Sequence, residues 1–193
     1  MTVQGPNKRG ILMDEWQLQA NEWIRIAYSA KTSQLLPKYQ YHILDRCLRG
    51  ASDIISCESV SVHSNTSSLI QWCKLWSDKA LHQYYQVRDE LTEQRLGKPP
   101  THRQICNARD STNKRWFTCE HEYPLVIPKK GVRDQDWTMQ QLSDWMCTYS
   151  KVTIILNSEN DRLLSWTEDM DIASKRYENT GIVVCEHPQH VIV

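Results

Sequence analysis

The sequence lacks net charge, because 23 basic residues balance 23 acidic ones in a chain of 193 residues. Zero net charge excludes the overall positive field that draws strongly basic proteins to nucleic acid, so nucleic-acid binding would need a local basic surface. No apolar run approaches the eighteen or so residues of a membrane span, and the N-terminal stretch lacks the apolar core of a secretory signal. We therefore expect a cytoplasmic protein with no membrane partner.

Several catalytic signatures are also missing. The sequence contains no GxGxxG, GxxxxGK[ST], HExxH or GxSxG motif, so the enzyme classes that these motifs mark are not predicted. The seven cysteines are odd in number and irregularly spaced, which argues against a disulfide framework. We expect most of them to be buried free thiols.

Phenylalanine is almost absent, with one residue against eight tryptophans and eight tyrosines. Tryptophan and tyrosine combine a large apolar face with a polar group, which suits either a core with hydrated edges or a binding surface.

The first half of the chain has helical periodicity. Apolar residues recur at helical spacing from Leu12 to about Ser29, and Pro37 suits the first turn of a second helix that Gly50 would end. Residues 51–65 suggest a strand or an ordered loop. A third helix is predicted from Thr66 or Ser67 to about Leu96, and the run from Gly97 to Pro100 ends it. We place a domain boundary there, giving a helical region at 1–97.

The second half changes character. We predict a small α+β domain over 98–193, with helices at 101–108 and 138–149 and a helix that begins at Asn157 or Ser158. "KRWFTCEHEYPLVIP" indicates two short strands with a kink, and the run Lys129 to Gly131 indicates a turn or loop. "KVTIIL" and "TGIVVCE" indicate further strands. The fold class is α+β, with an N-terminal helical bundle packed on a small mixed domain that contains a ββα-like hairpin-helix element.

The stretch "TCEHEYPL" concentrates titratable groups beside a predicted strand. It contains Cys119, Glu120, His121 and Glu122 within four residues. A neutral imidazole can take a proton from water near pH 7, and carboxylate and amide oxygens can hold a divalent cation. If His121 met the start of the helix at Asn157, the two segments would form a one-metal phosphodiester site.

Glu120-His121, followed after two residues by Pro124-Leu125, resembles the first half of the HNH, or ββα-metal, endonucleases. The later run "VTIILNSENDRLL" is similar to a pattern in small bacterial and phage proteins. The resemblance implies a metal-dependent endonuclease that hydrolyses DNA, with RNA as a possible substrate. His121 would be the general base, with Glu120 and Asn160 in catalytic positions, and the ligands of Mg²⁺ or Mn²⁺ (or of Zn²⁺) would be Glu120, Asn157 and Asn160.

This resemblance covers roughly residues 114–184 and departs from the family in several places. The usual glycine pair, the cysteine pairs and the closing histidine of the helix are missing. For phosphate contacts we single out Arg115, Lys129 and Arg162, because positive side chains near the cleaved bond neutralise backbone charge. Other cations flank "TCEHEYPL" on both sides: Lys98, His102, Arg103, Arg109 and Lys114 before it, and Lys130 and Arg133 after it.

Two other functions stay open. The first is a non-enzymatic phage or mobile-element factor that binds a host protein through exposed tryptophan and tyrosine side chains. The second is a zinc-stabilised nucleic-acid-binding module, since soft metal ligands gather in the second half. These are Cys106, Cys119, His121, Cys147, Cys185, His187 and His190.

Overall fold

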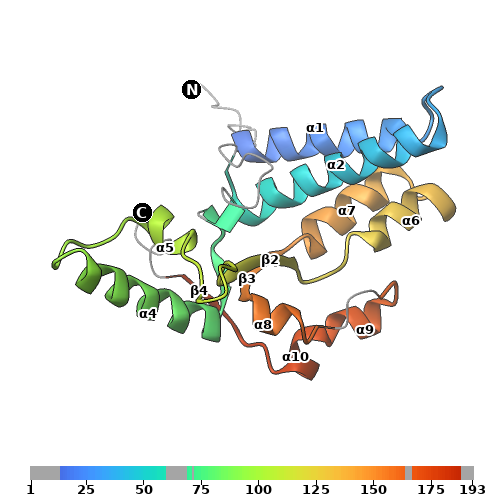
Figure 1. Cartoon of the computed structure of the whole chain (residues 1–193). Helices are drawn as coiled ribbons and strands as arrows, with labels where there is room; N and C mark the ends of the chain where they lie inside the picture. Colours follow the sequence, from blue (N-terminus) through green and yellow to red (C-terminus); the bar gives the residue numbers. More distant parts are fainter. Residues whose placement is uncertain (1–13, 60–68, 71, 164–166, 188–193) are drawn as a thin grey trace, which may run out of the picture.

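The computed structural model describes residues 14–59, 69–70, 72–163 and 167–187. Its helices surround a small central sheet, with two long helices on one side and a third on the other (Figure 1). The fold class α+β is confirmed.

Helices α1 (Glu15–Ala30) and α2 (Pro37–Cys57) run antiparallel along one side of the molecule. α1 agrees with the predicted helix, and the Gln17 side chain caps it by accepting the N–H of Asp14. The prediction that Gly50 ends the second helix is wrong. Gly50 lies inside α2, and a Cβ there would stand 3.4 Å from the Trp23 ring, so this small residue brings the two helices close together.

The sheet has the strand order β2-β3-β1-β4. β1 (Leu75–Ser77) and β3 (Val152–Leu156) are parallel neighbours, while β2 (Phe117–His121) and β4 (Val184–Glu186) pair antiparallel at the two edges. β3 agrees with the predicted buried strand. Because β1 precedes residue 97, the sheet takes strands from both sides of the boundary that the sequence suggests.

A single helix does not span 66–96. Trp76 is fully buried in β1, and α4 (Asp78–Gln94) begins only after it. The side chain of Ser77 caps α4 by accepting the N–H of Ala80 at 3.0 Å. Ser77 Oγ also donates to Glu159 Oε2 at 2.6 Å, which ties the start of α4 to the segment after β3.

The segment after His121 is helical, contrary to expectation. β2 is one strand rather than two, and α6 (Val126–Asp134) contains the run Lys129 to Gly131 that the sequence assigned to a turn. A Cβ on Gly131 would lie 2.2 Å from Cδ2 of Trp137. Gly131 is thus part of the packing between α6 and the following loop, and it does not end the helix.

The remaining elements are mostly short. Helix α7 (Met139–Tyr149) and its Thr138 cap agree with the prediction. The predicted helices near 101 and 157 exist as α5 (His102–Cys106) and α8 (Asn157–Asn160), and α9 (Met170–Ser174) and α10 (Arg176–Thr180) follow. No helix among the described ranges is long and apolar enough to cross a membrane.

Two large apolar clusters fill the interior. One lies around the sheet with α4 and α5, and it contains Trp76, Tyr84 and Phe117. The other joins α1, α2, α6 and α7 through Leu48, Leu142 and others. β2 ends beside the second cluster, where α2, α6 and α10 come close to His121.

Candidate functional site

The two halves of the expected metal site lie at opposite ends of the β2–β3 pair. In this antiparallel register His121 stands opposite Val152, whereas Phe117 stands opposite Leu156, the residue before Asn157. The four residue steps from Phe117 to His121 span about 14 Å, since a strand rises about 3.4 Å per residue. The expected convergence of His121 with the start of α8 is therefore not found.

The side chains near α8 have other partners. Asn157 Nδ2 donates to the carbonyl oxygen of Arg115, two residues before β2, and this bond fixes α8 near the start of the strand. Asn160 and Arg162 are exposed, and Arg162 Nε donates to the Ser158 carbonyl. Asn157, Asn160, Arg115 and Arg162 thus lie away from His121.

The proposed metal ligand Glu120 is already paired with a cation. Glu120 Oε1 accepts a hydrogen bond from Nη2 of Arg176 at 2.8 Å, so a guanidinium occupies the position next to this carboxylate. A metal ion would add a further positive charge beside Arg176 and Lys129 and would be repelled. Within the described ranges, no cluster of three or more histidine, cysteine, aspartate or glutamate side chains is arranged to hold a metal ion.

The soft ligands are also dispersed. Cys119 is on β2 and Cys185 is on β4, which form opposite edges of the sheet, while Cys147 is exposed on α7. His190 lies outside the described residues. Cys106 and His187 both lie beside His102, but no cluster that could hold a metal ion is found in the part of the chain that the structure covers.

His121 instead lines a pocket of about 150 Å³, which we call the His121 pocket. It lies where the end of β2 meets α2, α6 and α10, so side chains from four separate elements form it. Its lining residues are Arg49, Glu120, His121, Pro124, Leu125, Val126, Lys129 and Arg176.

Arg176 is the most deeply buried charge of this pocket. Its side chain is 2% exposed, and its guanidinium donates to Glu120 Oε1 at 2.8 Å and to the His121 carbonyl at 3.2 Å. The remaining guanidinium nitrogen, Nε, is buried and has no hydrogen-bond partner within the described structure. These contacts hold Arg176 in place and leave one of its three nitrogens, Nε, without a partner.

Lys129 and Arg49 supply two further positive charges. The Lys129 side chain, 6% exposed, forms an ion pair with Asp45 of α2, and Arg49 pairs with the same carboxylate at 3.3 Å. Burial alone would raise the pKa of Asp45, but the hydrogen bond and charge of Lys129, together with Arg49, lower it overall. The carboxylate therefore stays ionised and fixes both cations.

His121 is neutral in this setting. Its ring nitrogen Nε2 is fully buried and has no hydrogen-bond partner among the described residues. Burial, followed by the charges of Arg49 and Lys129, lowers the pKa of His121 to about 3. The imidazole can therefore donate or accept one hydrogen bond at Nε2, depending on its tautomer.

The pocket has the chemistry of an anion site. With His121 neutral, three cations (Arg49, Lys129 and Arg176) and two carboxylates (Asp45 and Glu120) leave one net positive charge. Buried polar groups normally have partners, so the unused Arg176 Nε and His121 Nε2 need an explanation. An oxyanion among the lining cations Arg49, Lys129 and Arg176 would be a favourable occupant.

Sequence reasoning found part of this pocket. It singled out Glu120, His121 and Lys129, which the structure brings together, but it missed Arg49 and Arg176. Arg49 has the spacing of an ordinary exposed helix residue, and Arg176 stands in a polar stretch that gives no sign of burial. Only the packing of α10 against the end of β2 reveals Arg176.

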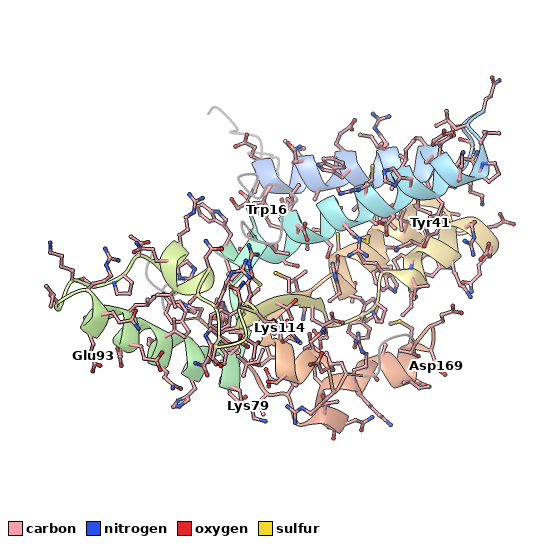
Figure 2. The ribbon with its side chains drawn as sticks, viewed as in Figure 1. Trp16, Tyr41, Lys79, Glu93, Lys114 and Asp169 are labelled. Atoms are coloured by element: carbon pink, nitrogen blue, oxygen red, sulfur yellow. The ribbon has the colours of Figure 1, made fainter. Side chains whose placement is uncertain are left out.

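The cations near the start of β2, Lys114 and Arg115, do not line this pocket. Lys114 lies near the start of β2, close to the centre of the molecule, whereas Tyr41 lies near the start of α2, beside α6 (Figure 2).

Comparison with known proteins adds no identity, because no protein-family model, curated protein or solved structure matches the chain.

Proposed function

We propose that the protein binds nucleic acid by holding one phosphate group in the His121 pocket. The observation that supports this proposal is the pair of buried cations, Arg176 and Lys129, beside the unpartnered Nε2 of His121. Guanidinium groups match the geometry of phosphate oxygens, and a net positive, partly dry pocket strengthens each charge-assisted hydrogen bond. Nucleic acid is the class of phosphate ester that the resemblance of the Glu120-His121 segment implies.

Metal-dependent DNA endonuclease activity stays a prediction, and it receives less support than phosphate binding. The resemblance assigns His121 as the general base, but burial lowers the pKa of its imidazole to about 3, which makes it a weak base near pH 7. The test is nicking of supercoiled plasmid by the wild type and by His121→Ala, with Mg²⁺ or Mn²⁺ and with a chelator. Metal-dependent nicking that disappears in the variant supports hydrolysis, and equal rates in both proteins exclude His121 as the base.

Binding itself is tested with a labelled single-stranded oligonucleotide and fluorescence anisotropy at several salt concentrations. Arg49→Gln removes one pocket cation, so the affinity should fall and the salt dependence should decrease by about 0.7 in log–log slope. Arg133→Gln is the matched control. Arg49 and Arg133 are both 51% exposed and both paired with a nearby aspartate, but Arg133 does not line the pocket. Equal losses in the two variants would contradict the proposal.

Binding of a host protein is a second candidate, favoured by apolar side chains near the turn between α1 and α2. Leu36, Tyr39 and Tyr41 are 61%, 51% and 42% exposed, beside a pocket of about 310 Å³ between α2 and α6. Tryptophan contributes little, since Trp72 alone is strongly exposed among the tryptophans of the described ranges. Leu36→Ser with Tyr39→Ser should abolish co-purification of a partner from cell extract without changing oligonucleotide binding. Unchanged co-purification would exclude this surface.

We further propose that the protein acts in the cytoplasm. The cysteines of the described ranges are free thiols, and four of them, Cys47, Cys57, Cys73 and Cys106, are buried. Reduced thiols persist in that compartment. Fluorescence microscopy of the tagged protein tests this placement, and a secreted or membrane-associated signal would contradict it.

A further inference from the structure

The His121 pocket is too small for a nucleotide. Its volume of about 150 Å³ is half or less of the ~300–1,000 Å³ that small-molecule sites usually enclose. A base and its sugar therefore have no room inside it. The part of a nucleic acid that enters is the phosphate group alone.

The two cations that attract this phosphate are buried. The side chains of Arg176 and Lys129 are 2% and 6% exposed, so a phosphate must enter the pocket, below the molecular surface, to approach them. An internal phosphodiester carries a sugar on each side, and both sugars would have to follow it. A terminal phosphate has a single ester bond and can enter end-on while its strand stays outside.

The arrangement of donors also suits a terminal phosphate. Arg176 and His121 line the pocket from different elements, α10 and β2. Lys129 Nζ approaches from α6 and Arg49 from α2. Donors on several sides match a group with three non-bridging oxygens better than an internal diester, which has two. The dianionic charge of a terminal phosphate also gains more from the surrounding cations.

We infer that the His121 pocket recognises the terminal phosphate of a nucleic-acid strand, in preference to an internal phosphodiester. This inference rests on the proposed nucleic-acid function and specifies which phosphate is held. Free inorganic phosphate has the same chemistry, so it should compete for the same pocket.

The experiment compares single-stranded oligonucleotides of one sequence that carry a 5′-phosphate, a 3′-phosphate or hydroxyls at both ends. Binding to the full chain is measured by anisotropy through an internal label, with and without inorganic phosphate. The expected result is about tenfold tighter binding of at least one phosphorylated strand, which corresponds to one charge-assisted contact. Inorganic phosphate should remove this difference and leave the weaker binding of the hydroxyl strand unchanged.

Variants connect the effect to the pocket. Arg49→Gln should reduce the preference for the phosphorylated strand several-fold, because Arg49 lines the pocket yet is half exposed and so replaceable without unfolding. Arg133→Gln should keep the preference. Circular dichroism checks that both variants are folded. A second lining variant, Lys129→Gln, should reduce the preference in the same direction, and an unchanged preference in it would contradict the assignment.

Each other outcome contradicts the inference in a recognisable way. If all three strands bind equally and Arg49→Gln weakens them equally, internal phosphates occupy the pocket, so nucleic-acid binding stands and end recognition is wrong. If inorganic phosphate binds but no strand does, both the inference and the nucleic-acid function are wrong. If neither binds, the pocket is not an anion site.

Discussion

Replacing Glu120 by glutamine separates the anion site from a metal site. In the wild type, Glu120 Oε1 neutralises Arg176, whose side chain is 2% exposed. Glu120→Gln removes the negative charge but keeps an acceptor oxygen, and the His121 carbonyl still accepts from Arg176. Breaking a buried ion pair at one partner costs about 3–5 kcal/mol in general. Because Glu120 is 24% exposed and one acceptor remains, we expect a loss of about 2 kcal/mol in the free energy of unfolding.

The same substitution should improve phosphate binding. The balance of three cations and two carboxylates changes to three and one, so the net charge around the pocket rises from one to two positive units. We expect roughly tenfold tighter binding of inorganic phosphate, in line with the loss of one nearby like charge. Phosphate at a hundred times its dissociation constant stabilises the folded protein by about 2.7 kcal/mol, which would offset the loss in stability.

The assay is urea unfolding with and without phosphate, with Glu168→Gln as the control. Glu168 forms an exposed ion pair with Lys130, so its replacement should change stability by less than about 1 kcal/mol and leave phosphate binding unchanged. A metal ligand would behave differently, since Glu120→Gln would weaken stabilisation by Mg²⁺ or Mn²⁺. Weaker phosphate binding in Glu120→Gln would refute the reasoning.

Two further predictions concern stability. Gly131→Ala should destabilise by about 1–3 kcal/mol in thermal or urea unfolding, because its Cβ would lie 2.2 Å from Cδ2 of Trp137, a case of overpacking. Gly50→Ala is the control, because its Cβ would meet Trp23 at an ordinary contact distance of 3.4 Å and alanine has the better helix propensity. Its loss of stability should therefore be small, and a loss as large as that of Gly131→Ala would contradict this explanation. Burial raises the pKa of Asp53 to about 7, although the charge of Arg49 opposes this shift. The folded protein therefore holds this proton more tightly than the unfolded chain does. The resulting stability is fully present below about pH 4 and is lost as the pH rises toward 7. Asp53→Asn should remove that decline and be more stable than the wild type at pH 8, by up to about 4 kcal/mol; an unchanged pH profile of unfolding would count against it.

Local signals predicted several elements correctly, because their information is close in sequence. Pro37 starts α2, and Thr138 caps α7 just before its apolar stripe. β3 was recognised from its continuous run of β-branched residues, which is typical of a strand buried on both faces. In each case a cap or a period specifies the element without help from distant residues.

Tertiary packing explains the errors. Trp76 continues the helical spacing of Trp72 and Cys73, yet it pairs with Ile154 and Cys185 in the sheet, and strand pairing outweighs local periodicity. The segment expected to turn at Gly131 is helical in the structure. The glycine is there because a Cβ would collide with the ring of Trp137.

The candidate site was predicted only in part for the same reason. Glu120 and His121 are adjacent in sequence, so their shared location was visible from the start. Arg176 reaches them from more than fifty residues away, and the partner expected on α8 lies at the other end of the strands. Strand register, which the sequence does not specify by itself, decides which of these groups meets His121.

The most direct test of the account is side-chain ¹⁵N NMR of the histidines while inorganic phosphate is added. The chain has seven histidines, which His121→Ala helps to assign. The account predicts a saturable shift of the His121 Nε2 resonance, with the other histidines nearly unchanged, and a much weaker response in Arg49→Gln. An unchanged His121 resonance at saturating phosphate would contradict the central claim that this pocket holds a phosphate group.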